Sequence, residues 1–387
     1  MLAASAMLVS QAPTALHHQE EPLRVLIVGG GPDRKNNQVA IESNVKYVAH
    51  LLPQGASPRV LFASGDPTSK NVLCEDEQSR PYYRAPNLPR LDGPSELSSF
   101  RAEMSSLAKR PNGSPVFLYF TGHGGPDEDS NYDNNVFDMW RGNELSVREL
   151  ATSLNSFSSS TPVTLVMVEC FSGAFGNLLF EGGNPANGLT SRPICGFFAS
   201  VPQRMAAGCT PEIDEAEYKD FTGYFFAALT GVDRMGRRTT GADYRHDGRI
   251  GMDEAYAYAL IHDDSIDTPV CTSDVFLRHF LKTSDREVMA TPFSRLKGWA
   301  SPPQRAALEA LAADLGLGQE SSLQDAYNRF LNMDLDSDDL SDVHLIRFVR
   351  LGKSVVLGHN LMSTGAPEVK TRYQALLKLE AGNPLRR

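Results

Sequence analysis

Residues 116–124 have the sequence Val-Phe-Leu-Tyr-Phe-Thr-Gly-His-Gly, and a second stretch at 163–173 runs Val-Thr-Leu-Val-Met-Val-Glu-Cys-Phe-Ser-Gly. Each is a short apolar run rich in β-branched or aromatic residues, which is typical of a buried strand. In an open α/β sheet, ligands bind beyond the carboxyl ends of the strands. Two neighbouring parallel strands would therefore present His123 and Cys170 together, as an imidazole beside a nucleophilic thiol.

The flanking sequence predicts alternating strands and helices. Ser146 and Glu149 form a capping-box pattern, which indicates a helix between the two stretches. Such alternation implies right-handed crossovers and a mainly parallel sheet covered on both faces, an α/β three-layer sandwich. The composition of residues 65–94 predicts a long surface loop. The other expected elements are strands at 23–28, 59–63 and 194–200 and helices at 37–52, 95–108, 221–229 and 253–261.

The order of the two motifs resembles that of the caspase/legumain superfamily of cysteine peptidases, which includes metacaspases, gingipains and clostripain. In caspases the histidine lies ~50 residues before the cysteine, close to the separation found here. The resemblance covers residues 22–285 and implies a caspase-like (caspase-hemoglobinase) fold. It also implies a catalytic dyad of Cys170 and His123, with an oxyanion hole formed by the N–H groups of Gly124 and Cys170. The implied chemistry needs no cofactor, and the implied substrate is a protein or peptide.

One position departs from the family pattern. Many members carry Glu, Asp or Gln two residues before the nucleophile, where it lines the specificity pocket. Here that position is Val168, and the carboxylate is Glu169. Successive strand residues face opposite sides, so Glu169 is expected to point away from the pocket. The legumain Arg-His pair is also missing near Asn36. The substrate-binding residues are therefore unknown, and the choice among Asn, Asp, Lys and Arg before the scissile bond stays open.

The resemblance implies a cysteine endopeptidase that works through a thioester acyl-enzyme. Two alternatives remain open from the sequence alone. The first is a transpeptidase or ligase on the same dyad, in which an amine replaces water. The second is a non-catalytic interaction module of the same fold, although the intact His123 and Cys170 argue against it.

Composition excludes several other classes. A net charge of −10 argues against general binding to nucleic acid or anionic membranes. No run of ~20 apolar residues predicts a membrane span. The five cysteines form no Cys-x-x-Cys pair, so no zinc site is expected. Residues 243–254 resemble a calcium loop, but Arg245 stands where an oxygen ligand is needed, which favours a loop that leads into a helix.

Three regions are expected along the chain. Residues 1–21 form a flexible N-terminus or a weak signal segment without Lys or Arg before its apolar part, so export and a cytoplasmic location both remain open. Residues 22–285 form the peptidase domain, within which the Gly- and Asn-rich stretch 174–192 is expected to be a mobile loop and the site of any self-cleavage. Residues 286–387 form a helical C-terminal region, with helices at 303–315, 323–331 and 373–379, that is either a restraint or a structural extension. The sequence leaves the oligomeric state unknown.

Overall fold

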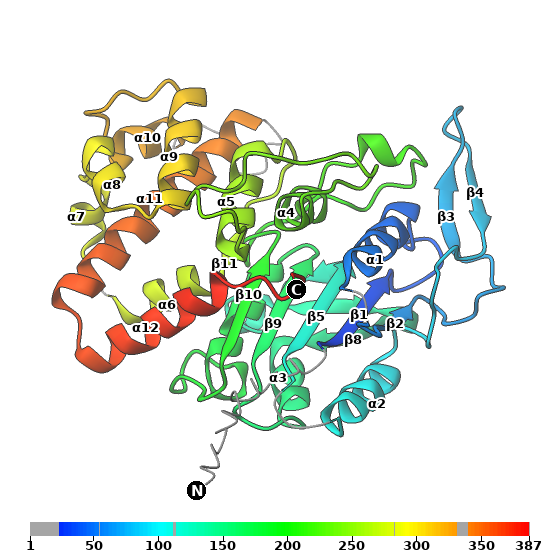
Figure 1. Cartoon of the computed structure of the whole chain (residues 1–387). Helices are drawn as coiled ribbons and strands as arrows, with labels where there is room; N and C mark the ends of the chain where they lie inside the picture. The colour runs from blue at the N-terminus through cyan, green and yellow to red at the C-terminus, as the bar shows by residue number, and fades with distance from the viewer. Residues whose placement is uncertain (1–22, 54, 111–113, 282, 331–339, 387) are drawn as a thin grey trace, which may run out of the picture.

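The computed structural model describes residues 23–53, 55–110, 114–281, 283–330 and 340–386. Its centre is a six-stranded sheet with the order β11-β10-β9-β5-β1-β2 (Figure 1). Neighbouring strands in this sheet run parallel except β10 and β11. The strands are β1 (Arg24–Gly30), β2 (Arg59–Phe62), β5 (Val116–Gly122), β9 (Val163–Val168), β10 (Ile194–Phe198) and β11 (Val270–Cys271).

Helices cover both faces of this sheet, so the predicted α/β sandwich is confirmed. Helices α1 and α4 lie over one face, and α2 and α3 lie over the other (Figure 1). Helix α3 begins at the predicted capping box, in which Ser146 accepts from the Glu149 N–H and Glu149 accepts in return. The bounds are α1 (Val39–Leu51), α2 (Leu97–Ala108), α3 (Val147–Leu154), α4 (Phe221–Thr230) and α5 (Met252–His262).

Two small antiparallel sheets were not predicted. The stretch expected to be a long loop contains a hairpin of β3 (Val72–Glu75) and β4 (Pro81–Arg84). Between the histidine strand and α3, β6 (Gly124–Gly125), β7 (Val136–Met139) and β8 (Asn143–Ser146) form a three-stranded sheet. These strands have at most four residues, too few to show a clear alternation of apolar and polar side chains.

The stretch after Cys170 corrects the prediction of a mobile loop. Its first part is a 3₁₀ helix, Ser172–Leu179, in which every residue is buried. Exposed or half-exposed residues begin at Glu181 and continue to Ser191, with Gly183 buried among them. The glycine and asparagine content therefore reflects tight packing in the first part and exposure only in the second. The other 3₁₀ helices are Glu128–Ser130, Trp140–Gly142, Glu181–Gly183 and Glu215–Glu217.

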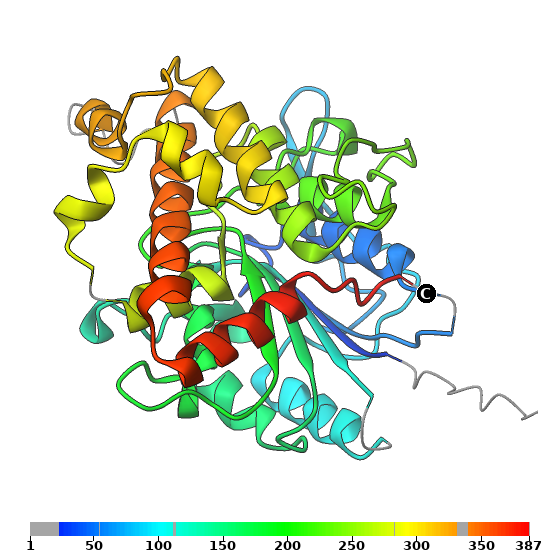
Figure 2. The same ribbon diagram turned by 60° about the vertical axis from the view of Figure 1, so that its left-hand side comes forward.

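The described residues beyond 284 form helices only. They pack into the same hydrophobic core as the sheet, with Leu308, Leu311 and Val355 buried among its members. Helix α12 (red in Figure 2) crosses beside β10, and α11 (orange) contacts α12. The helices are α6 (Thr272–Phe280), α7 (Asp285–Met289), α8 (Phe293–Trp299), α9 (Pro302–Asp314), α10 (Leu323–Phe330), α11 (Leu340–Thr364) and α12 (Pro367–Glu380). Leu331, predicted to end α10, lies outside the described residues.

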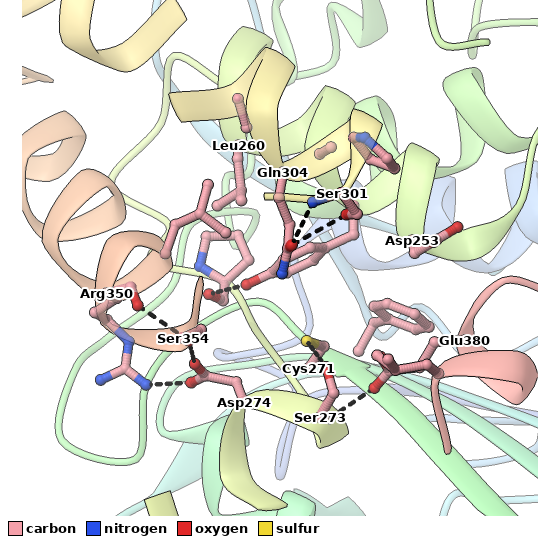
Figure 3. Close-up of a pocket in the computed structure, with 18 of the residues that line it drawn as sticks. Asp253, Leu260, Cys271, Ser273, Asp274, Ser301, Gln304, Arg350, Ser354 and Glu380 are labelled. Carbon is pink, nitrogen blue, oxygen red and sulfur yellow. Dashed lines mark hydrogen bonds and ion pairs between the residues drawn. The ribbon is translucent and has the colours of Figure 1, made fainter. Parts of the chain in front are cut away.

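Buried polar contacts also attach the C-terminal helices. The carboxylate of Glu380 accepts hydrogen bonds from the Thr272 hydroxyl and the Ser273 N–H, each at 2.7 Å, beside a cavity of about 70 Å³ (Figure 3). Burial raises the pKa of Glu380 to about 7. At the opposite side of this cavity, Arg350 donates to Asp274 at 2.7 Å. The C-terminal helices are thus tied to the sheet through both apolar and polar groups.

The described residues also bear on the predictions about membrane spans, cysteines and metal binding. None of the described helices combines the length and the apolar character needed to cross a bilayer. All five cysteines are free thiols. In the stretch 243–254, Arg245 pairs with Asp253 and Glu254, and no cluster of three or more potential metal ligands occurs among the described residues. The segment 1–21 lies outside the described residues.

Candidate active site

The pairing of β5 with β9 places the two predicted site residues at one edge of the sheet. In this parallel pair, Thr121 lies opposite Val168. His123 and Cys170 each come two residues later, at the carboxyl ends of neighbouring strands, where ligands bind in such sheets. Both side chains are half-buried, so a ligand can reach them.

Backbone and side-chain acceptors orient the His123 ring. Its Nε2 lies 2.9 Å from the carbonyl oxygen of Asn36 and 3.0 Å from Oε1 of Gln38. Both partners accept hydrogen bonds, so Nε2 carries the proton and Nδ1 keeps its lone pair. Burial lowers the pKa of His123, which favours the neutral imidazole. The ring is therefore prepared to accept a proton at Nδ1.

Cys170 contacts the backbone of Ala206. The Ala206 N–H donates to Sγ at 3.3 Å, and the thiol lies 3.7 Å from the carbonyl oxygen of the same residue. Burial raises the pKa of Cys170, and the bond from Ala206 opposes that shift. Among the described residues, no hydrogen bond joins this thiol to the His123 ring. The resting pair is therefore a neutral thiol near a neutral imidazole.

The residue after Cys170 has an unusual backbone. Phe171 adopts a left-handed conformation with φ 62°, which is rare for a bulky side chain. Its N–H donates to the carbonyl of Arg204 at 2.8 Å, and its own carbonyl accepts from Asn135 at 3.0 Å. The buried Asn135 side chain also donates to the carbonyl of Pro202 at 2.9 Å. Surrounding hydrogen bonds thus hold a backbone conformation of a kind that concentrates at functional sites.

Gly124 occupies a position that excludes any side chain. A Cβ built there would lie 2.6 Å from the carbonyl oxygen of Cys170 and 2.8 Å from that of Val136. Only glycine permits this close approach of the two strand ends. The backbones of Gly124 and Cys170 are therefore neighbours.

Glu169 is buried beside this glycine. Its side chain is 1% exposed, and neither carboxyl oxygen has a hydrogen-bond partner among the described residues. A Cβ at Gly124 would lie 2.9 Å from its Cγ, which places the side chain under the glycine. Burial, followed by the nearby Asp138 carboxylate, raises the pKa of Glu169 well above its usual value. Because the charged form is strongly disfavoured, the carboxyl is expected to hold a proton.

Several residues that build this site carry no signal in the sequence. Gln38 orients His123 and Asn135 holds the turn after Cys170, but isolated amides between elements are common in loops. Ala206 contributes only its backbone, which no side-chain pattern can reveal. These contacts arise from the tertiary arrangement of loops far apart in the sequence.

Comparisons with known proteins add similarities of structure at low identity. No family model matches the chain, and no curated protein matches it. A structural-genomics protein from Geobacter sulfurreducens is similar with a TM-score of 0.39 and 14% identity, over 65% of this chain and 92% of that one. A secreted C11 cysteine protease from Bacteroides thetaiotaomicron is similar with a TM-score of 0.31 and 10% identity, over 76% of this chain and 83% of that one.

Proposed function

We propose that this protein is a cysteine endopeptidase in which Cys170 is the nucleophile and His123 the general base. The observation that supports this most directly is the parallel register of β5 and β9, which brings the two residues to one accessible sheet edge. In addition, Nδ1 of the neutral His123 ring keeps its lone pair, and Gly124 lets a second backbone approach the nucleophile.

The proposed reaction is acyl transfer. The Cys170 proton moves to Nδ1 of His123 as Sγ bonds to the scissile carbonyl carbon. Backbone N–H groups of Gly124 and Cys170 would stabilise the resulting oxyanion, for which one donor is worth about 3 kcal/mol. The C–N bond then breaks, the leaving amine takes the proton from the imidazolium, and water hydrolyses the thioester.

The test is peptide cleavage by wild-type protein and by Cys170→Ala and His123→Ala, using a diverse peptide library. Each substitution should lower kcat by at least about 10³-fold, because the dyad acts as a unit. Cys209→Ser is the matched control, since Cys209 is another half-buried thiol, bonded to the carbonyl of Gly122 at 3.4 Å. Near wild-type turnover by Cys170→Ala would exclude the proposed nucleophile.

Product analysis separates hydrolysis from ligation. With an added amine nucleophile, a peptidase should give mainly free carboxyl products. Predominant formation of a new amide would instead identify a transpeptidase or ligase on the same dyad. Peptide binding without any cleavage would instead indicate a non-catalytic interaction module.

A further inference from the structure

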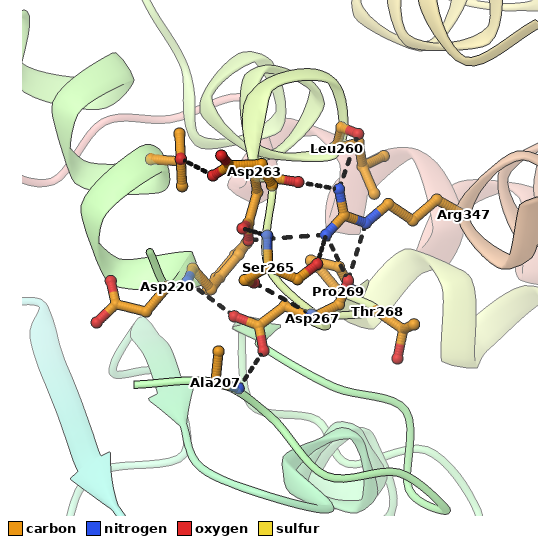
Figure 4. Close-up of polar contacts among 12 residues, drawn as sticks. Ala207, Asp220, Leu260, Asp263, Ser265, Asp267, Thr268, Pro269 and Arg347 are labelled. Carbon is orange, nitrogen blue, oxygen red and sulfur yellow. Dashed lines mark hydrogen bonds and ion pairs between the residues drawn. The ribbon is translucent and has the colours of Figure 1, made fainter. Parts of the chain in front are cut away.

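Arg347 of helix α11 is a buried cation that serves one loop of the peptidase domain. It is 2% exposed, and it donates to backbone carbonyls from every nitrogen of its guanidinium (Figure 4). Nε and Nη2 donate to Asp267 at 2.8 and 2.6 Å, Nη1 to Asp263 at 2.5 Å and to Leu260 at 3.4 Å, and Nη2 to Ser265 at 3.2 Å. Burying a charged group costs folding free energy unless hydrogen bonds compensate for the lost water. The backbone carbonyls around Arg347 provide that compensation.

The loop that Arg347 holds carries the buried carboxyl group of Asp267. Asp267 is 0% exposed, and its two carboxyl oxygens accept from the Ala207 N–H at 2.7 Å and the Phe221 N–H at 2.9 Å. These two bonds fix the side chain in place, while burial and the neighbouring Asp263 raise the pKa of Asp267 well above its usual value. Nη2 of Arg347 also lies 3.9 Å from the carboxyl group of Asp263.

Asp267 in turn anchors the segment that touches the nucleophile. We call residues 204–207 the nucleophile wall. The Arg204 carbonyl in this wall accepts from Phe171, and the Ala206 N–H donates to Sγ of Cys170 at 3.3 Å. Asp267 fixes the next peptide unit, at Ala207. A continuous chain of hydrogen bonds therefore runs from α11 to the thiol.

We infer that Arg347 is a positioning residue for Cys170, acting through Asp267 and the nucleophile wall, and that helix α11 is an integral part of the active site. This inference rests on the proposed function, since it gives the nucleophile its support. The described hydrogen bonds of Arg347 all go to backbone carbonyls of this loop, not to the thiol. Its role is to fix the loop whose Asp267 side chain holds the wall that contains the Ala206 N–H.

The first test measures the thiol directly, without any substrate. The rate at which iodoacetamide alkylates Cys170 is followed against pH by peptide mass spectrometry in full-length protein. Arg347→Met should change both this rate and its pH midpoint, because the Ala206 N–H no longer holds its position against Sγ. Arg347→Lys keeps the charge but loses the fork of donors, so partial recovery is expected.

Arg350→Met is the matched control. Arg350 lies on the same helix and also pairs with the N-terminal part of the chain, but its ion-pair partner is Asp274 of helix α6 and not the loop around Asp267. This variant should lose stability and leave the alkylation profile of Cys170 unchanged. An equal change in both variants, or no change in Arg347→Met, would overturn the inference.

A second variant decides the matter if Arg347→Met does not fold. Asp267→Asn replaces one acceptor oxygen by a donor that faces a backbone N–H. It should alter Cys170 alkylation in the same direction as Arg347→Met, and an unaltered profile would overturn the inference.

Peptide cleavage separates this inference from the proposed function. If wild-type protein cleaves peptides, Arg347→Met should lower kcat by about 10²-fold with a smaller effect on KM, as expected for a misplaced reactive group. If wild-type protein cleaves none, the proposed function fails, while the alkylation profiles still test whether Arg347 positions the thiol.

Discussion

The buried carboxyl group of Glu169 lies directly next to the proposed nucleophile in the sequence. Glu169 is as buried as the strands around it, yet within the described part of the chain neither of its oxygens has a hydrogen-bond partner. Such a group has a folded-state pKa above its unfolded value, since burial disfavours the ionised form. The folded state therefore binds this proton more tightly than the unfolded chain does.

This linkage predicts a loss of stability at higher pH. As pH rises from the unfolded pKa of about 4.3 toward the raised folded pKa, the contribution of Glu169 should fall by about 1.4 kcal/mol per pH unit. Glu169→Gln removes that slope, so the variant should gain stability relative to wild type between pH 5 and pH 8. Urea unfolding at both pH values checks this. An equal difference at the two values would show that Glu169 does not titrate with a raised pKa.

The proposed general base predicts the acid limb of activity. Burial disfavours the imidazolium, so His123 remains a neutral base to lower pH than an exposed histidine. The acid limb of kcat/KM should thus have its midpoint below 6.5, the ordinary histidine value. A pH profile of peptide cleavage measures it, and Cys209→Ser should leave the midpoint in place. A midpoint above 6.5 would assign the limb to another group.

Among elements, helix α3 offers a test of how local sequence signals contribute. The Ser146 hydroxyl accepts from the Glu149 N–H, so Ser146→Ala should cost about 1 kcal/mol of unfolding free energy. Thr152→Ala in the same helix is the control, because Thr152 is exposed and its hydroxyl bonds to the carbonyl of Arg148, within the same helix. It should change stability by less than about 0.5 kcal/mol. Equal losses of unfolding free energy in both variants would show that the Ser146 cap does not stabilise α3.

The connection after Cys170 predicts where cleavage can occur. Ser172–Leu179 is buried, whereas residues 181–190 are largely exposed. Limited proteolysis with a protease of broad specificity should cut within 181–190 and spare 172–179. Self-cleavage in this connection, if it takes place, should fall in the same exposed part and be absent from Cys170→Ala. Mass spectrometry locates the cuts, and early cuts within 172–179 would contradict the buried arrangement.

Sequence patterns predicted those elements that have one clear environment. The central strands β1, β5 and β9 are buried on both faces and appear in the sequence as continuous apolar runs. The start of α3 is marked in the sequence by its capping box. Helix α11 was missed, because buried residues such as Leu345, Leu351 and Leu357 occur around much of its circumference and leave no single apolar stripe.

The residues of the candidate site also divide into those that sequence patterns predicted and those that they did not. His123, Cys170 and Gly124 were predicted because each belongs to a short motif at a strand end. Arg347 and Asp267 were not, because a charged residue in the sequence suggests an exposed side chain. Their burial depends on packing between segments about 80 positions apart, which local patterns do not encode.

For the whole molecule, the C-terminal helices belong to the same packed structure as the central sheet. They share its hydrophobic core and supply the buried side chains of Arg347 and Glu380. A chain ending at Ser284 would expose apolar surface of the core and leave the backbone carbonyls around Asp267 without donors.

The truncated chain is therefore expected to aggregate or to unfold, and any soluble fraction should be less active than the full-length protein. Size-exclusion chromatography and peptide cleavage by the two chains provide the measurement. A soluble truncated chain with higher activity would show that the C-terminal helices restrain the site.

The position of Arg347 in the chain also sets the order in which the molecule can mature. Domains generally fold as they emerge during synthesis, N-terminal parts first. His123 and Cys170 leave the ribosome long before α11 does, so the nascent chain holds both reactive residues but lacks the side chain that supports the nucleophile wall. Activity would then begin only once α11 has been made. Ribosome-bound chains stalled before residue 340 should not show the Cys170 alkylation profile of the finished protein, and the same profile in both would show that the thiol matures earlier.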